Sequence, residues 1–369
     1  MARPEKPALS RPTAPASAAA DVPASGLVPH DPSGAWHWLG GVALCAAVAA
    51  LATLAGSWVP LMGGPVLGIV LGIVLGRLLP STVQALRPGL RFTSKAVLQA
   101  AVVLLGAGLS LGQVARTGLD SLPVMVGTLL VALGGTALLG RRLGLGEQTR
   151  TLIGVGTGIC GASAIATVSA VIGASEVAVS LAVTTIFVFN VLAAVLFPVL
   201  GHALGLGQEA FGLWAGTAIN DTSSVVAAAT VYGAAATSYA VVVKLSRTLM
   251  IIPVSVALAV RGHRAERRAA DGTGQAAAGV PWRKLVPAFL VLFLVAAALN
   301  TAGVVPDAAH DPIKWISVFL TTMAMTAIGL STPVAALKEA GWRPLALGGI
   351  LSVAVAASSL GLQALTGAL

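Results

Sequence analysis

The sequence predicts an all-α, polytopic membrane protein, and three observations support this prediction. Only 9% of the 369 residues are charged, whereas soluble globular chains carry about 25%. The hydrophobic fraction is 56% and the mean hydropathy is +0.91. Apolar stretches that approach the ~20 residues needed to cross a bilayer recur along most of the chain. Together these features exclude an ordinary soluble enzyme.

The first 34 residues differ from the rest of the chain. They are rich in Pro, Ala and Ser and show no hydrophobic periodicity, so they cannot bury enough apolar surface to offset the entropy of ordering. We expect residues 1–34 to form a disordered cytoplasmic tail. Residues 35–369 are expected to form one transmembrane domain.

About eleven hydrophobic segments follow this tail, separated by short polar breaks. They lie at 36–59, 61–79, 94–115, 118–140, 151–172, 177–203, 211–232, 236–260, 285–303, 312–335 and 342–366. In the second segment, glycines recur at every fourth position (Gly64, Gly68, Gly72 and Gly76). Such a stripe of small residues predicts close packing against a neighbouring helix.

The basic residues predict an orientation, because Lys and Arg collect on the cytoplasmic side of membrane spans. With the N-terminus inside, 18 of the 22 basic residues lie in the cytoplasmic tail and loops, at 3–11, 77–95, 141–150, 261–284 and 338–343. The run 261–284 is expected to be a solvated loop. We therefore predict an inner-membrane protein with its N-terminus in the cytoplasm and its C-terminus outside.

An internal similarity joins two segments in the middle of the chain. Residues 156–174 match residues 216–234 at a constant offset of 60, with seven of nineteen positions identical. Duplication of this kind is typical of transporters built from inverted repeats, with broken or re-entrant helices. Two arrangements stay open: the segments each cross the membrane once, or both re-enter, from opposite faces. The loops beside them contain no Lys or Arg that could decide.

The most informative polar cluster follows Gly216. Asp221 is the one acidic residue well inside an apolar segment, and a carboxylate buried in a membrane is costly unless it is paired, solvated or protonated. We expect Asp221 to bind a coupling ion. A structural role, in which Asp221 pairs with a cation and fixes two helices, is the alternative. The neighbouring amide and hydroxyl groups suit an unwound helix that binds substrate: Thr217, Asn220, Thr222, Ser223 and Ser224.

Two cations lie deep in the following segment. Lys244 and Arg247 are three residues apart, and therefore share one helical face. Together with Asp221 they leave a formal surplus of one positive charge, which a bound anion would neutralise. We expect both side chains to bind the anionic substrate, because guanidinium and ammonium groups suit oxyanions. Alternatively, one pairs with Asp221 and the other reaches the membrane surface.

The matching segment carries small residues and hydroxyl groups without charge. Half-helix N-termini attract anions through their backbone N–H groups and the helix dipole. The substrate-binding candidates here are Thr157, Cys160, Gly161 and Ser163. Tight helix packing is the alternative. Asn190, in the segment between the repeats, needs a polar partner, and a bond between helices is favoured over substrate contact.

Several of these stretches resemble uncharacterised bacterial membrane proteins of the YeiH type, a family named for sulfate export. The resembling residues are 156–165, 211–216, 221–226, 243–247 with 251–253, and 327–332. The family looks distantly related to cation/proton antiporters and bile acid symporters, which implies crossed broken helices beside a panel domain. Members often carry His where this chain has Asn220, so no His-linked proton step is expected.

These features predict a secondary active transporter, in the exporting direction, of a small anion such as sulfate, sulfite or an organosulfonate. The expected partners are this anion, H+ or Na+, and the lipid bilayer; a homo-oligomer is left open and nucleic acid is not expected. A sodium/proton antiporter is the first alternative. A membrane-embedded hydrolase using Ser163 or Ser223 with Lys244 is the second. Because no nucleotide-binding loop or His/Cys cluster is present, we expect no cofactor, metal or catalytic residue.

Overall fold

A computed structural model describes residues 32–56, 63–269, 288–332 and 341–369. Every regular element in these ranges is helical, and seven helical stretches are long and apolar enough to cross a membrane. The predicted all-α, polytopic membrane fold is confirmed. The predicted tail falls almost wholly outside the described residues, since the first helix begins at Pro32.

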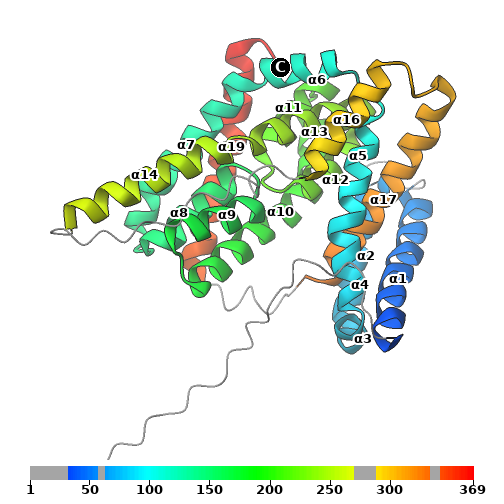
Figure 1. The fold of residues 1–369 in the computed structure, drawn as a ribbon, viewed down its shortest axis with the longest axis horizontal. Coiled ribbons are helices and arrows are strands. Elements are labelled where there is room, and N and C mark those ends of the chain that lie inside the picture. The colour runs from blue at the N-terminus through cyan, green and yellow to red at the C-terminus, as the bar shows by residue number, and fades with distance from the viewer. Residues whose placement is uncertain (1–31, 57–62, 270–287, 333–340) are drawn as a thin grey trace, which may run out of the picture.

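The helices form two groups, which lie side by side in Figure 1. The first group lies on the right and surrounds α17, against which α1, α2 and α5 pack. Short helices α3 and α4 and a π-helical turn, η1, lead into α5. The group consists of α1 (Pro32–Gly56), α2 (Gly63–Leu78), α3 (Pro80–Ala85), α4 (Arg87–Phe92), η1 (Thr93–Val97), α5 (Leu98–Gly106), α16 (Ala288–Thr301), η2 (Asp307–Ala309) and α17 (His310–Leu330).

The glycine stripe of α2 packs directly on α17, as predicted. A Cβ added at Gly72 would lie 2.5 Å from the carbonyl oxygen of Thr326, and one at Gly76 would lie 2.7 Å from that of Leu330. Both distances are far below van der Waals contact, so only glycine allows the two backbones to approach this closely.

The second group contains the internal repeat and lies on the left of Figure 1. Amphipathic helix α6 (Leu111–Asp120) leads from the first group to this one. The members are α7 (Leu122–Arg142), α8 (Glu147–Gly158), α9 (Ala162–Ile172), α10 (Glu176–Ala203), α11 (Gln208–Ala218), α12 (Thr222–Tyr232), α13 (Ala234–Thr248), α14 (Ile251–Ala269) and α19 (Trp342–Thr366).

The two repeated segments are re-entrant helical hairpins. Gln148, at the start of α8, donates from Nε2 to the carbonyl oxygen of Gly173 (3.3 Å) and accepts from the backbone N–H of Ser175 (3.0 Å). The end of α9 has therefore returned to the start of α8. Each arm of 11 or 12 residues spans about 17 Å, which is roughly half of a ~30 Å hydrocarbon core.

The second hairpin, α11–α12, closes in the same way. Gln208, 60 residues after Gln148, accepts from the backbone N–H groups of Ala235 (3.0 Å) and Ala236 (3.3 Å). The Tyr232 hydroxyl donates to the carbonyl oxygen of Leu206 (2.5 Å). The 28-residue α10 separates the two hairpin bases, so they lie at opposite ends of the fold and the tips meet between them. Of the two predicted arrangements, the structure has the re-entrant one.

Two predicted boundaries are wrong. The segment 94–115 is not one helix: α5 ends at Gly106, and a capping box of Ser110 and Gln113 starts α6. The segment 236–260 agrees with the span Ala234–Val260, in which a turn after Thr248, shortly before Pro253, separates α13 from α14. The run 261–284, expected as a loop, continues α14 to Ala269.

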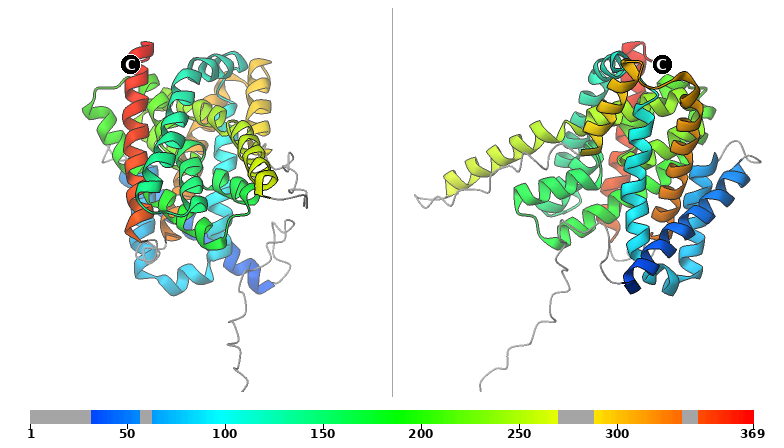
Figure 2. Two further views of the ribbon diagram at one scale, coloured as in Figure 1. Left: turned by 90° about the vertical axis from the view of Figure 1, so that its left-hand side faces the viewer. Right: turned by 45° about the vertical axis from the view of Figure 1, so that its right-hand side comes forward.

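The ends of the described chain lie on opposite sides. Figure 2 shows α19 (red) running through the full height of the fold to the C-terminus at the top, whereas α1 (blue) starts at the bottom. The shorter apolar helices α2 and α16 add to the seven long spans. An odd number of passes with two re-entrant hairpins accounts for the opposite ends.

Candidate functional site

The tips of the two hairpins meet in the middle of the second helix group. The first tip is the non-helical turn 159–161 and the second is 219–221. A Cβ at Gly161 would lie 3.5 Å from Cβ of Asp221 and 3.6 Å from the carbonyl oxygen of Asn220. Gly161 also has φ +69°, in the left-handed region that favours glycine. The repeat therefore brings together the two polar segments that the sequence singled out.

Lys244 joins the two tips. Its side chain is completely buried, and Nζ donates to the carbonyl oxygens of Ile159 (3.0 Å) and Ile219 (2.7 Å). Each of these residues directly follows the last turn of a hairpin helix, α8 or α11. Carbonyl groups at helix C-termini lack helical partners and carry partial negative charge. One ammonium group therefore satisfies an acceptor from each repeat.

Arg247 does the same one turn further along α13. Its completely buried guanidinium donates from Nε to the carbonyl oxygen of Gly158 (2.7 Å) and from the two terminal nitrogens to those of Thr157 (3.2 Å) and Thr217. The two cations together hold five carbonyl groups. A contact of either cation with an anion stays a prediction, because in this structure these donors are directed at the backbone.

Asp221 caps the N-terminus of α12. Its Oδ2 accepts from the backbone N–H of Ser223 (3.0 Å) and from the Ser223 hydroxyl, and its own N–H donates to Oδ1 of Asn190 (3.1 Å). The predicted bond of Asn190 to a neighbouring helix is thus present. Among the described residues no ion pair joins Asp221 to Lys244 or Arg247, so neither cation neutralises the carboxylate by direct contact.

Two buried polar atoms near the tips have no hydrogen-bond partner among the residues that the structure describes. They are Oγ1 of Thr157 and Oδ1 of Asn220, on side chains that are 0% and 2% exposed. Buried polar atoms are nearly always paired, and each unpaired one costs about 1–3 kcal/mol. Both lie within two residues of a hairpin tip, which is consistent with a site that a solute or ion completes.

Only some of the other predicted residues lie in the buried cluster at the hairpin tips. Cys160, Ser223 and Ser224 are buried and Thr222 is half-buried. The Thr217 hydroxyl donates to the carbonyl oxygen of Leu213 (2.6 Å) and lies 2.7 Å from Oγ of Ser359 in α19, where it anchors the hairpin. Ser163 is exposed, in the first turn of α9, apart from the buried cluster.

Sequence reasoning missed the residues that fix the hairpins. Gln148, Gln208 and Ser359 carry these contacts, and within α19 Gln363 donates to Oγ of Ser359 (3.2 Å). The offset of 60 between Gln148 and Gln208 was a usable signal, because it extends the internal repeat beyond the matched residues. Ser359 carries no such pattern, since it acts only through a tertiary contact.

Comparison with known proteins places the chain among membrane proteins. The family described as conserved hypothetical protein 698 matches residues 40–348. A UPF0324 membrane protein of Streptococcus pyogenes serotype M3 is 42% identical over 333 residues, covering 88% of this chain and 96% of the relative. Others from Streptococcus pneumoniae strain R6 and Streptococcus agalactiae serotype V are each 40% identical, covering 89% of this chain and 97% of each relative. No solved structure matches.

Proposed function

Because the chain belongs to the family of conserved hypothetical protein 698, whose matched relatives are named membrane proteins, we propose that it is a secondary transporter of a small anion. The substrate class is that of sulfate, sulfite or an organosulfonate, moved outward. The observation that carries the proposal is the meeting of two re-entrant hairpins at a buried cluster with unequal charges. Such a crossing of broken helices is a frequent position for substrate sites in transporters.

The charge balance favours an anion. Lys244, Arg247 and Asp221 sum to a formal charge of +1. The helix ends at the tips cancel, because the C-termini of α8 and α11 point at the cations while the N-termini of α9 and α12 begin at the same tips. A positive charge left in a low-dielectric interior is costly, and a bound anion removes that cost.

Asp221 supplies the coupling. Protonation of this carboxylate, or binding of Na+ to it, raises the formal charge of the cluster from +1 to +2, which increases its attraction for an anion and matches a divalent one. The anion in turn raises the affinity of the site for H+ or Na+, since linkage is reciprocal. The two ligands then move together through alternating exposure of the hairpins, and they move outward when the outward anion gradient exceeds the opposing ion gradient.

Each predicted residue has a place in this scheme. Lys244 and Arg247 hold the tips and supply positive potential. The N-terminus of α9, which has no side-chain cap and follows Gly161, offers the N–H groups of Ala162 and Ser163 to the anion. The unpaired hydroxyl of Thr157 and amide of Asn220 complete the hydrogen bonding of substrate or ion, along with the polar residues of the crossing: Cys160, Thr217, Thr222, Ser223 and Ser224.

A sodium/proton antiporter is the second candidate, favoured by one specific observation. The unpaired Asn220 Oδ1 is an acceptor next to the Asp221 carboxylate, and oxygen ligands suit a hard cation. Flux in proteoliposomes distinguishes the two. Currents that depend on sulfate, sulfite or sulfonate support the anion transporter, whereas proton release driven by sodium with no anion dependence supports the antiporter and contradicts our proposal.

The hydrolase alternative lacks its catalytic pair. A serine nucleophile needs a base within hydrogen-bond reach, but Ser223 is bonded to Asp221, and Lys244 donates to carbonyl oxygens. Ser163 and Lys244 share no hydrogen bond in the described structure. We therefore propose no enzymatic activity. Labelling of a serine by an activated phosphonate would contradict this.

The proposed location is the bacterial inner membrane, with the N-terminus in the cytoplasm and the C-terminus outside. The hairpins do not change the side of any basic loop, because each returns to the face from which it started. The base of α8–α9 then lies at the cytoplasmic face and the base of α11–α12 at the outer face.

A further inference from the structure

A second candidate binding site lies between the two helix groups. A cavity of about 300 Å³ is lined by α5 and α17 on one side and by α12 and α13 on the other. Ligand cavities commonly measure about 300–1,000 Å³, so this one suits a small solute. It adjoins a second cavity of about 510 Å³, with which it shares Gly108, Ala235 and Ser238.

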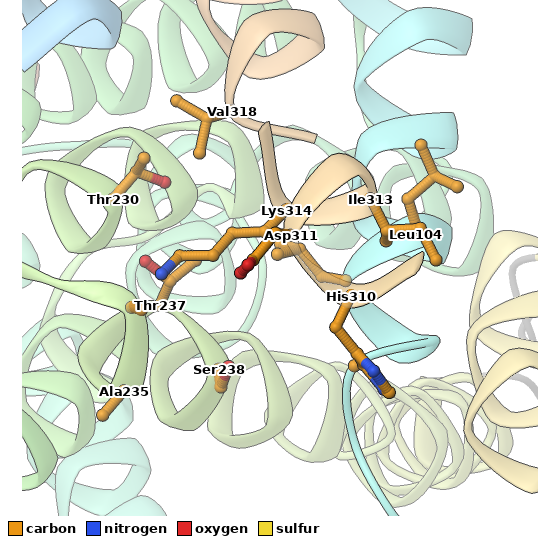
Figure 3. A pocket seen from close by; sticks show the side chains of 13 residues that line it. Leu104, Thr230, Ala235, Thr237, Ser238, His310, Asp311, Ile313, Lys314 and Val318 are labelled. Carbon is orange, nitrogen blue, oxygen red and sulfur yellow. The ribbon is translucent and has the colours of Figure 1, made fainter. Parts of the chain in front are cut away.

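One wall carries a positive and a negative charge. Asp311 and Lys314 are one helical turn apart on α17 and both line the cavity. Within the described part of the chain no ion pair joins them. In Figure 3 the Lys314 side chain extends toward Thr237 with Asp311 beside it, whereas His310 points away. His310 lies 3.1 Å from Oδ1 of Asn300, so its ring is held outside this charge pair.

The facing wall offers hydrogen-bond acceptors. Thr230 donates its hydroxyl proton to the carbonyl oxygen of Val226 (2.6 Å), and Thr237 donates its own to that of Gly233 (2.8 Å). Their remaining lone pairs can accept from a ligand. The oxygens of Asp311 add to this acceptor set, while the ammonium of Lys314 is a donor. Leu104, Leu105, Ile313 and Val318 supply apolar surface between the polar groups.

We propose that this cavity binds a small zwitterion, of the aminoalkanesulfonate class, before it reaches the hairpin tips. The acid group binds Lys314, the ammonium group binds Asp311 and the threonine hydroxyls, and the short alkyl spacer lies on the leucines. A simple anion satisfies only one half of these contacts, and a simple cation only the other. The assignment rests on the proposed function, and the sulfonate group is the part of the zwitterion that carries the negative charge required at the hairpin crossing.

Equilibrium binding to the purified full chain in lipid nanodiscs, measured by titration calorimetry, tests this site without requiring transport. The probes are 2-aminoethanesulfonate, its carboxylate analogue β-alanine, and two half-molecules, ethanesulfonate and ethylammonium. We expect 2-aminoethanesulfonate to bind at least ~10-fold more tightly than either half-molecule, since each lost charge-assisted contact costs about a factor of ten. Weaker binding of β-alanine identifies the acid group as a sulfonate.

Two variants separate the two halves of the site. Lys314→Gln should weaken 2-aminoethanesulfonate and ethanesulfonate alike by about tenfold, whereas Asp311→Asn should weaken 2-aminoethanesulfonate and ethylammonium by about that factor and leave ethanesulfonate unchanged. Both side chains are exposed, so both variants should fold, and melting temperatures check this. Arg142→Gln, which removes another exposed cation, should bind like the wild type.

The proposal is overturned if ethanesulfonate binds as tightly as the zwitterion, or if Asp311→Asn has no effect, since the site then takes a simple anion. It is also overturned if neither variant changes binding. Failure of the proposed function is distinguishable, because it would show as absence of anion flux in proteoliposomes while zwitterion binding and its dependence on Lys314 persist.

Discussion

At the residue scale, Arg247 and Lys244 explain why two cations are tolerated in the interior of a membrane protein. Both are completely buried, and both donate to carbonyl oxygens at helix ends instead of to a carboxylate. Five hydrogen bonds replace the lost hydration. The cations therefore have a structural task, joining the repeats, as well as the electrostatic one that we propose for substrate.

Arg247→Met should destabilise the protein by roughly 3 kcal/mol or more, because it leaves three buried carbonyl groups without their donor. Thermal unfolding in detergent would measure this. The melting temperature of Arg247→Lys should lie between those of the wild type and Arg247→Met, since a compact ammonium group cannot contact all three carbonyl groups as the planar guanidinium does.

The matched control is Arg116→Met, which removes an exposed cation and should change the melting temperature little. If Arg247→Met and Arg116→Met had the same melting temperature, the hairpin tips would not depend on the guanidinium, and Arg247 would not have the proposed structural role.

At the element scale, the two hairpins are fixed at their bases by the same residue type with different bonding. Gln148 uses both its amide nitrogen and its oxygen, whereas Gln208 uses only its oxygen. Gln208→Glu should therefore be neutral or slightly stabilising, since a carboxylate still accepts from the first N–H groups of α13. Gln148→Glu should cost about 1 kcal/mol through loss of the donor to Gly173. Equal melting temperatures for the two variants would contradict this reading.

The close contact of α2 with α17 should make the protein sensitive to any side chain added at the contact. Gly72→Ala should destabilise by about 1–3 kcal/mol, because the new methyl group would overlap the backbone of Thr326. Gly134→Ala in α7, where no atom of the described residues lies within 4 Å of the added Cβ, should be near neutral. Thermal melting of the two variants, side by side, separates crowding from any general effect of alanine. A neutral Gly72→Ala would show that the helices have room to part.

The sequence predicted the helices better than it predicted their ends. The segments at 177–203 and 342–366 agree closely with α10 and α19, because a long apolar run between polar flanks predicts one membrane-spanning helix with defined ends. Prediction failed where a helix stops inside an apolar run, as at Gly106. Such an end depends on capping and on side-chain contacts, which the hydropathy of the sequence does not reveal.

The candidate site was predicted in composition and not in geometry. Thr157, Asn220, Asp221, Lys244 and Arg247 were all singled out by polarity inside apolar segments, and the fold does bring them to one crossing. The partners of the cations could not have been predicted, because they are backbone carbonyl groups, which every residue carries. Only the path of the chain decides which carbonyls are left free.

At the scale of the whole molecule, the re-entrant hairpins fix which loops face which side. If both repeated segments crossed the membrane, Glu176 would be outside and Glu209 inside. With two hairpins and a cytoplasmic N-terminus, Glu176 is inside and Glu209 outside. Both side chains are exposed, so Glu176→Cys and Glu209→Cys report directly on the topology.

In intact cells, a membrane-impermeant maleimide should label Glu209→Cys and should label Glu176→Cys only after lysis. Cys45 and Cys160 are buried and can be replaced by Ala to give a silent background. The reverse labelling pattern would mean either that the two segments cross the membrane or that the proposed orientation is wrong.

We propose that the carboxylate at the hairpin crossing, Asp221, couples the movement of an ion to that of the anion. Asn preserves the cap of α12, because its amide oxygen also accepts from the Ser223 N–H, so Asp221→Asn should fold. The most direct measurement is uptake of sulfate, sulfite and a sulfonate into proteoliposomes under an imposed proton or sodium gradient, with Glu176→Gln as the control. We expect Asp221→Asn to lose gradient-driven uptake while retaining anion exchange. Unchanged gradient-driven uptake in this variant would show that Asp221 is not the coupling group.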